Sequence, residues 1–75
     1  MNRVQHLAWA KKRALEYLPG DPGQAVASML SDLRKYEGED NPWDGDFLMF
    51  IGTDGIQKAQ RDDVAGVRSW INGFN

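Results

Sequence analysis

The first hydrophobic pattern along the chain has the period of an α-helix. Asn2 is a favourable N-cap residue, and Gln5 follows three residues later, as in a capping box. Apolar residues then recur on one helical face, at Val4, Leu7, Ala8, Leu15 and Leu18. Pro19 and Gly20 interrupt this pattern. We therefore expect a helix over residues 3–18 that buries this face.

A second helical pattern begins directly after that break. Asp21 is a favourable N-cap residue, and Pro22 suits the first helical position. The apolar stripe consists of Val26, Met29, Leu30 and Leu33. Because the connection between the two segments is only about two or three residues long, the helices must pack antiparallel. The sequence thus predicts a helical hairpin over residues 3–37.

The middle of the chain is less regular. Residues 37–46 are rich in Glu, Asp, Gly, Asn and Pro, a composition typical of a loop. Residues 47–51 are apolar at every position, so periodicity does not distinguish a short buried helix from a strand. The sequence Gly-Thr-Asp-Gly at 52–55 predicts a turn. We favour a short helix over 47–51, and the alternative is a β-hairpin over 47–60.

The last stripe predicts a helix over residues 63–73. Asp62 or Asp63 is expected to cap this helix, and Gly73 to end it. Its apolar positions are Val67, Trp70, Ile71 and Phe74. The expected fold class is all-α, a small bundle of three to four helices built on the N-terminal hairpin. The alternative is an α+β fold that contains the hairpin at 47–60.

The composition limits the sites that this chain can build. With 75 residues, we expect a single domain over 1–75. The absence of Cys excludes disulfides and thiolate zinc sites, and one His is too few for a His-rich metal centre. No apolar run approaches the ~20 residues of a membrane-spanning helix. We therefore expect no metal, no cofactor and no insertion into a membrane.

The net charge of −2 conceals a strong asymmetry along the chain. Residues 1–35 carry a net charge of +3, residues 36–57 carry −6, and residues 58–75 carry +1. The central segment contains six acidic residues and no basic one. A segment this one-sided within so short a chain is a candidate interaction surface.

The sequence contains no recognisable catalytic constellation. His6 lies opposite the expected apolar face of the first helix, and we predict it to be a surface residue. Carboxylates need a partly dry cleft to shift their pKa values, and a chain of this size can hardly build one. If Gly45 is taken as the sixth position of an EF-hand loop, two ligand positions fall on Pro42 and Ile51, so we expect no calcium site. We therefore expect no enzyme.

The aromatic and charged residues favour binding to a protein. Trp9 lies outside the expected apolar face and beside Arg13, a composition typical of binding hot spots, unless a later helix covers it. Trp43 lies among acidic residues, either packed down as an anchor or exposed as a contact. Carboxylates around an aromatic residue can dock on a basic groove. The predicted contacts are Trp9, Arg13, Glu39, Asp40, Trp43, Asp44 and Asp46.

Several segments together resemble a family of small accessory proteins encoded by tailed bacteriophages and prophages. These segments are His6-Leu-Ala-Trp9, Arg13-Ala-Leu-Glu-Tyr-Leu18, Ala27-Ser-Met-Leu-Ser-Asp-Leu33 and the ending Val67-Arg-Ser-Trp-Ile-Asn-Gly-Phe-Asn75. The resemblance covers about residues 4–35 and 63–75. It implies a phage accessory protein made in the host cytoplasm, and it brings no known activity, because the family is functionally uncharacterised. The acidic centre departs from the family pattern.

These observations predict a protein that binds and modulates or inhibits a host protein. The expected partners are a defence nuclease, such as a CRISPR effector, or the host machinery of transcription, replication or division. One alternative is a nucleic-acid-binding regulator that uses Lys11, Lys12, Arg13 and Lys35. A further alternative is a minor virion or assembly protein, either monomeric or oligomeric.

Overall fold

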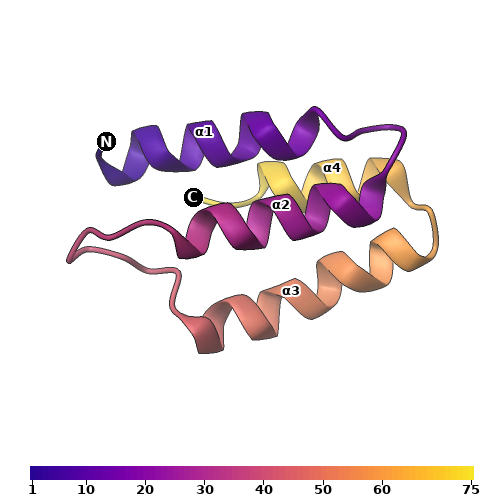
Figure 1. The fold of residues 1–75 in the computed structure, drawn as a ribbon. Helices are drawn as coiled ribbons and strands as arrows, with labels where there is room; N and C mark the ends of the chain where they lie inside the picture. The colour runs from indigo at the N-terminus through magenta and orange to yellow at the C-terminus, as the bar shows by residue number, and fades with distance from the viewer.

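Four α-helices and no β-strand make up the computed structural model, which describes residues 1–75 (Figure 1). The helices are α1 (Arg3–Leu15), α2 (Pro22–Arg34), α3 (Gly45–Gln60) and α4 (Val64–Asn72). The prediction of an all-α bundle built on an N-terminal helical hairpin is confirmed. The alternative α+β fold is wrong, because residues 47–60 are helical throughout. None of the helices combines the length and the apolar character that crossing a membrane requires.

Each helix begins at a polar residue that accepts a hydrogen bond from the first turn. At α1, the Asn2 side chain accepts from the Gln5 backbone amide, and the Gln5 side chain accepts from the Asn2 amide. The carboxylates of Asp21, Asp44 and Asp63 cap the other three helices in the same way. These caps satisfy backbone donors that have no partner inside a helix, so the short polar residues fix where each helix starts.

The turn expected over residues 52–55 does not exist, because α3 runs through it as one helix of 16 residues. Gly52 and Gly55 are both buried on its inner side, and neither has a positive φ angle. A Cβ atom at Gly55 would lie 2.7 Å from the Trp70 ring, and one at Gly52 would lie 3.0 Å from the end of Leu30. These glycines therefore allow α3 to approach its neighbours closely. The turn was predicted because glycine is common in turns, whereas here both glycines are needed for close packing of a helix.

The four helices surround a core to which α2 and α4 contribute most. α1, α2 and α3 lie side by side in Figure 1, with α4 behind α2. α2 and α4 each contact all three other helices, whereas α1 and α3 do not contact one another. The residues predicted as the stripe of α4 are all buried, and the Trp70 and Phe74 rings meet edge to face. The loop between α2 and α3 projects beyond the helices at the end where both termini lie (Figure 1).

The buried face of α1 is turned by about a third of a turn from the predicted one, and of the predicted residues Leu7, Leu15 and Leu18 pack partly buried against the core. The structure buries His6, Ala10 and Ala14, whereas Val4 is 70% exposed and Ala8 is exposed. The largest contact between two helices is that of α1 with α2. Ala10 and Ala14 of α1 and Ala25 of α2 are all fully buried. Small side chains let two helices approach closely, so the alanine face gains more packing than the larger apolar residues would.

Candidate protein interface

An aromatic cluster joins α1 to the end of α2 and to the following loop. The His6 ring is central, with ring centroids 5.2 Å from Trp9, 5.2 Å from Tyr36 and 6.3 Å from Trp43. His6 is 8% exposed, so the prediction of a surface histidine is wrong. Trp43 is 3% exposed and acts as an anchor for the loop, and Trp9 is partly buried against the core. Both predicted tryptophan contacts are therefore engaged in packing within the chain.

His6 also forms a hydrogen bond that fixes its orientation. Its Nε2 atom lies 2.6 Å from the backbone carbonyl oxygen of Asp32, in the last turn of α2. A carbonyl oxygen only accepts, so Nε2 carries the proton and donates. The same carbonyl also accepts from the Lys35 backbone amide at 3.2 Å, so His6 is its second donor at the end of α2. Its role is to hold α1 against the end of α2.

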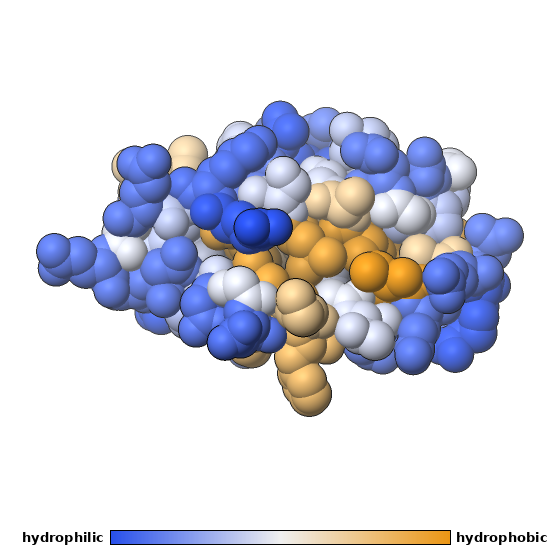
Figure 2. Space-filling view, turned by 60° about the horizontal axis from the view of Figure 1, so that its bottom comes forward, coloured by the Kyte–Doolittle hydropathy of each residue, from blue (hydrophilic) through white to orange (hydrophobic).

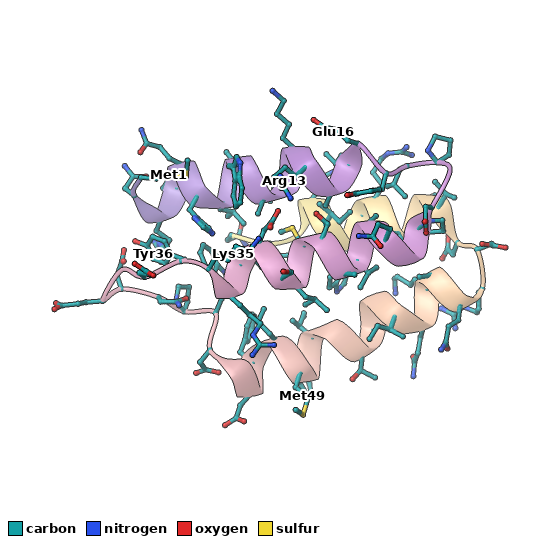
Figure 3. All side chains as sticks on the ribbon, viewed as in Figure 1. Met1, Arg13, Glu16, Lys35, Tyr36 and Met49 are labelled. Atoms are coloured by element: carbon teal, nitrogen blue, oxygen red, sulfur yellow. The ribbon has the colours of Figure 1, made fainter.

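The most buried charge in the molecule is the carboxylate of Asp32, whose side chain is 1% exposed. Arg13 Nε donates to one carboxylate oxygen at 2.6 Å, and Lys35 Nζ donates to the other at 3.2 Å. The hydrogen bond to Asp32 raises the pKa of Arg13 above its ordinary value. The Arg13 guanidinium also lies 5.0 Å from the centre of the Trp9 ring. Arg13, predicted as a partner contact, is thus held by its own chain (Figure 3).

The basic residues proposed for nucleic-acid binding are largely occupied within the chain. Arg13 and Lys35 neutralise Asp32, and Lys11 Nζ donates to the backbone carbonyl of Asn72 at 3.2 Å. Of the four residues proposed for this role, Lys12 alone makes no ion pair or side-chain hydrogen bond. Arg13, Asp32 and Lys35 line an open groove of about 300 Å³ beside α2. Ser28 also lines this groove, and its buried hydroxyl has no partner.

The acidic loop, residues 37–46, is held in place by a small network. The Tyr36 hydroxyl donates to Asp40 Oδ1 at 2.5 Å, and this hydrogen bond raises the pKa of Tyr36 above its ordinary value. Asn41 donates through its side-chain amide to the Tyr36 carbonyl at 3.0 Å, and it accepts from the Trp43 backbone amide at 2.7 Å. Together with the buried Trp43 ring, these bonds fix the backbone of the loop.

The four predicted acidic contacts divide into two kinds. Asp40 accepts from Tyr36 and lies 3.9 Å from Arg3 Nε, and Asp44 caps α3 by accepting from the Phe47 amide at 2.8 Å. Glu39 and Asp46 are exposed and form no ion pair. No group of three or more acidic or histidine side chains is placed to hold a metal ion. The unpaired acids are therefore the ones that can meet a partner.

A second surface, not predicted from the sequence, lies along α3. We call it the α3 outer face: Met49 and Phe50, 75% and 80% exposed, lie on its outward side, and Phe47 and Ile56, 40% and 47% exposed, lie at its two opposite edges. Figure 2 brings this side forward and shows hydrophobic residues gathered along its middle, with hydrophilic residues at both ends. Met49 points away from the other helices (Figure 3). Single exposed apolar residues are common, but four on one helix indicate an interaction surface.

Sequence reasoning missed this face because it treated residues 47–51 as one short buried element. The signal was present in the spacing from Asp46 onward. Met49 and Phe50 follow Asp46 at three and four residues, which places all three on the outward side of one continuous helix. Leu48 and Gly52 point inward and are buried.

Protein-family models, curated proteins and solved structures were each compared with this chain, and none matches it.

Proposed function

We propose that this protein binds another protein and modulates or inhibits it, by docking the acidic loop on a basic surface of that partner. One observation carries the proposal. The carboxylates of Glu37, Glu39 and Asp46 are exposed, form no ion pair within the chain, and lie on or beside the loop that projects from the bundle (Figure 1). Binding, and not catalysis, is the activity that such a surface supports.

The physical basis of this binding is electrostatic attraction to a preorganised loop. Exposed charges of one sign speed the encounter with an oppositely charged partner and disfavour partners of like charge. The anchored Trp43 and the hydrogen bonds of Asn41 already hold the loop in one conformation. A loop that is ordered before binding loses less conformational entropy when it docks.

The expected partner is a host protein with a basic groove. The resemblance to phage accessory proteins supports this class, and proteins that handle nucleic acid carry basic grooves for the phosphate backbone. A defence nuclease, such as a CRISPR effector, and the host machinery of transcription, replication or division are the candidates. Competition with DNA or RNA for the same groove would explain inhibition.

Affinity purification from host cells, followed by mass spectrometry, tests the proposal with a matched pair of variants. Glu39→Lys reverses one exposed charge on the acidic loop, and Glu16→Lys reverses one exposed charge at the end of α1, away from it. We expect Glu39→Lys to lose partners that the wild-type chain and Glu16→Lys both retain. The retained complexes should weaken as salt rises. Equal capture of partners by both variants would show that the acidic loop does not take part in binding.

Asp40 and Asp44 are unsuitable for this test, although both were predicted contacts. Asp44→Lys would remove the cap of α3, which costs about 0.5–2 kcal/mol of stability. Asp40→Lys would break the hydrogen bond from Tyr36. Any loss of binding in these variants would mix a change of fold with a change of surface charge.

Of the two alternative functions, one gains support from the structure's geometry. The α3 outer face provides an apolar surface of the kind that an assembly protein uses. The nucleic-acid alternative has less support, because Arg13, Lys35 and Lys11 already have partners within the chain.

A further inference from the structure

The charges at the two ends of α3 are opposite and unpaired. Asp46 lies in the first turn and Arg61 is the C-cap residue, and neither forms an ion pair within the chain. Counted along the helix, Asp46, Phe50, Thr53, Gln57 and Arg61 are separated by three or four residues, so they follow one line on the outward side. This line passes along the α3 outer face from a negative end to a positive end.

Such a line is complementary to itself when it is reversed. Two copies of α3 placed antiparallel bring Asp46 of each copy to Arg61 of the other, whereas a parallel arrangement would place like charges together. The midpoint of the line is Thr53, a small side chain whose hydroxyl already donates to the Met49 carbonyl at 3.0 Å. Thr53 can therefore lie at a close crossing without leaving an unsatisfied donor.

We propose that a second copy of this chain covers the α3 outer face, with the two α3 helices antiparallel about a two-fold axis at Thr53. Phe50 of each copy then lies across from Gln57 of the other, and two Asp46–Arg61 pairs close the ends. This contact is isologous, as expected for a symmetric dimer. The proposal does not depend on the proposed function, and of the acids in the acidic loop the dimer uses Asp46 alone.

The size of the face sets the strength of this dimer. A helix of 16 residues is about 24 Å long, and a strip about 10 Å wide along it gives roughly 500 Å² over both copies. Stable complexes bury about 1,200–2,000 Å², so this dimer is weak and forms only as the protein concentration rises. Association therefore depends on the concentration reached in the cell.

Sedimentation equilibrium over a concentration series tests the dimer. We expect reversible association of the wild-type chain below about 1 mM, the limit that a contact of this size allows. Phe50→Lys should weaken association at least about tenfold. Val4→Lys is the matched control, because Val4 is 70% exposed on α1, away from α3. Glu39→Lys should leave association unchanged, which separates the dimer from the function of the acidic loop.

Charge reversal at the ends of α3 tests the antiparallel arrangement. Asp46→Arg and Arg61→Asp should each weaken association, because each creates two like-charge pairs in the dimer. The double variant, and an equimolar mixture of the two single variants, should restore it. Circular dichroism confirms that each variant keeps its helices. A purely structural effect predicts the opposite, because the two reversals oppose the helix dipole and their costs would add.

Two results would overturn the proposal. A wild-type chain that stays monomeric up to about 1 mM would do so, and the face would then be left for a different protein or a membrane surface. Association that is unaffected by Phe50→Lys, or that the double charge reversal fails to restore, would place the contact elsewhere or in another orientation.

Discussion

Substituting alanine for each glycine of α3 tests whether this helix is continuous and packed closely on α4. At Gly55, the added Cβ atom would lie 2.7–2.9 Å from three atoms of the Trp70 ring system. At Gly52, it would lie 3.0 Å from the movable end of Leu30, and at Gly45 it would meet nothing within 4 Å. The same chemical change is thus made in one helix against three different surroundings.

The expected effects follow from two opposing contributions. Replacing Gly by Ala within a helix stabilises it by about 0.5–1 kcal/mol, because Ala has less conformational freedom to lose. Overpacking a core costs about 1–3 kcal/mol. Moving the Trp70 ring also weakens the hydrogen bond from its Nε1 to the Ile51 carbonyl, 3.0 Å long, which contributes about 0.5–1.5 kcal/mol.

We therefore expect Gly55→Ala to lower the free energy of unfolding by about 1–3 kcal/mol. Gly45→Ala should be neutral or stabilising by up to about 1 kcal/mol. Gly52→Ala should lie between them, because the end of Leu30 can shift. For a chain of this length, a loss of 1 kcal/mol lowers Tm by about 4–8 °C. Urea unfolding monitored by circular dichroism and by tryptophan fluorescence measures all three.

A different order of the three variants in their free energy of unfolding would refute this reasoning. If Gly55→Ala were as stable as the wild-type chain while Gly45→Ala was stabilised, Trp70 would not lie against α3. If both Gly52→Ala and Gly55→Ala were destabilised equally and strongly, a turn that needs glycine would explain the data better than a continuous helix.

Three further predictions concern the groups that join α1, α2 and the acidic loop. His6→Ala should cost about 2–4 kcal/mol in urea unfolding, because it leaves the Asp32 carbonyl with the Lys35 amide as its one donor and opens the aromatic cluster; an unchanged midpoint would contradict this. Arg13→Gln should destabilise the protein more than Asp32→Asn does, since it leaves the buried carboxylate with Lys35 alone, and a double-mutant cycle should show coupling. The pKa of Tyr36 is raised above its ordinary value of 10.0, so its contribution to stability is complete below pH 10.0 and is lost as the pH rises through the folded-state pKa. Tyr36→Phe should therefore flatten the alkaline end of the stability profile, and Asp40→Asn should lower the pH at which tyrosinate absorbance appears.

The elements that the sequence predicted well depend on local chemistry. The caps at Asn2, Asp21 and Asp63 need only a short polar side chain next to the first turn. The stripe that includes Val67 and Ile71 is apolar on one side and polar on the other, so only one face of α4 can enter the core. In both cases, the residues that decide the structure lie within a few positions of one another.

The elements that the sequence predicted poorly depend on what lies across a helix contact. Ala10 and Ala14 have little hydrophobicity of their own, and their value appears only when another helix packs against them. Gly55 lies in a segment whose composition is typical of a turn, and the reason for a glycine there is the Trp70 ring, which leaves no room for a side chain. The role of these residues depends on side chains far away in the sequence, so the local pattern of residues does not reveal it.

The candidate site was affected by the same limit. Trp9, Arg13 and Trp43 have the composition of a binding hot spot, but His6, Asp32 and Tyr36 engage them within the chain. His6 looked exposed only because the buried face of α1 was assigned about a third of a turn away. The charge asymmetry along the sequence did locate the exposed acids, since unpaired carboxylates remain in water whatever the helices do.

The two surfaces would act together if both proposals hold. The acidic loop joins the N-terminal end of α3, so an antiparallel pair of α3 helices carries its two loops at opposite ends. A partner with two basic sites, or a dimeric partner, could then engage both loops, and its apparent affinity would exceed that of one loop without any new contact. Phe50→Ala should remove this gain while keeping the affinity of a single loop, because it adds no charge beside the loop. Glu39→Lys should weaken each loop in monomer and dimer alike, so the two variants separate the strength of one contact from the number of contacts made.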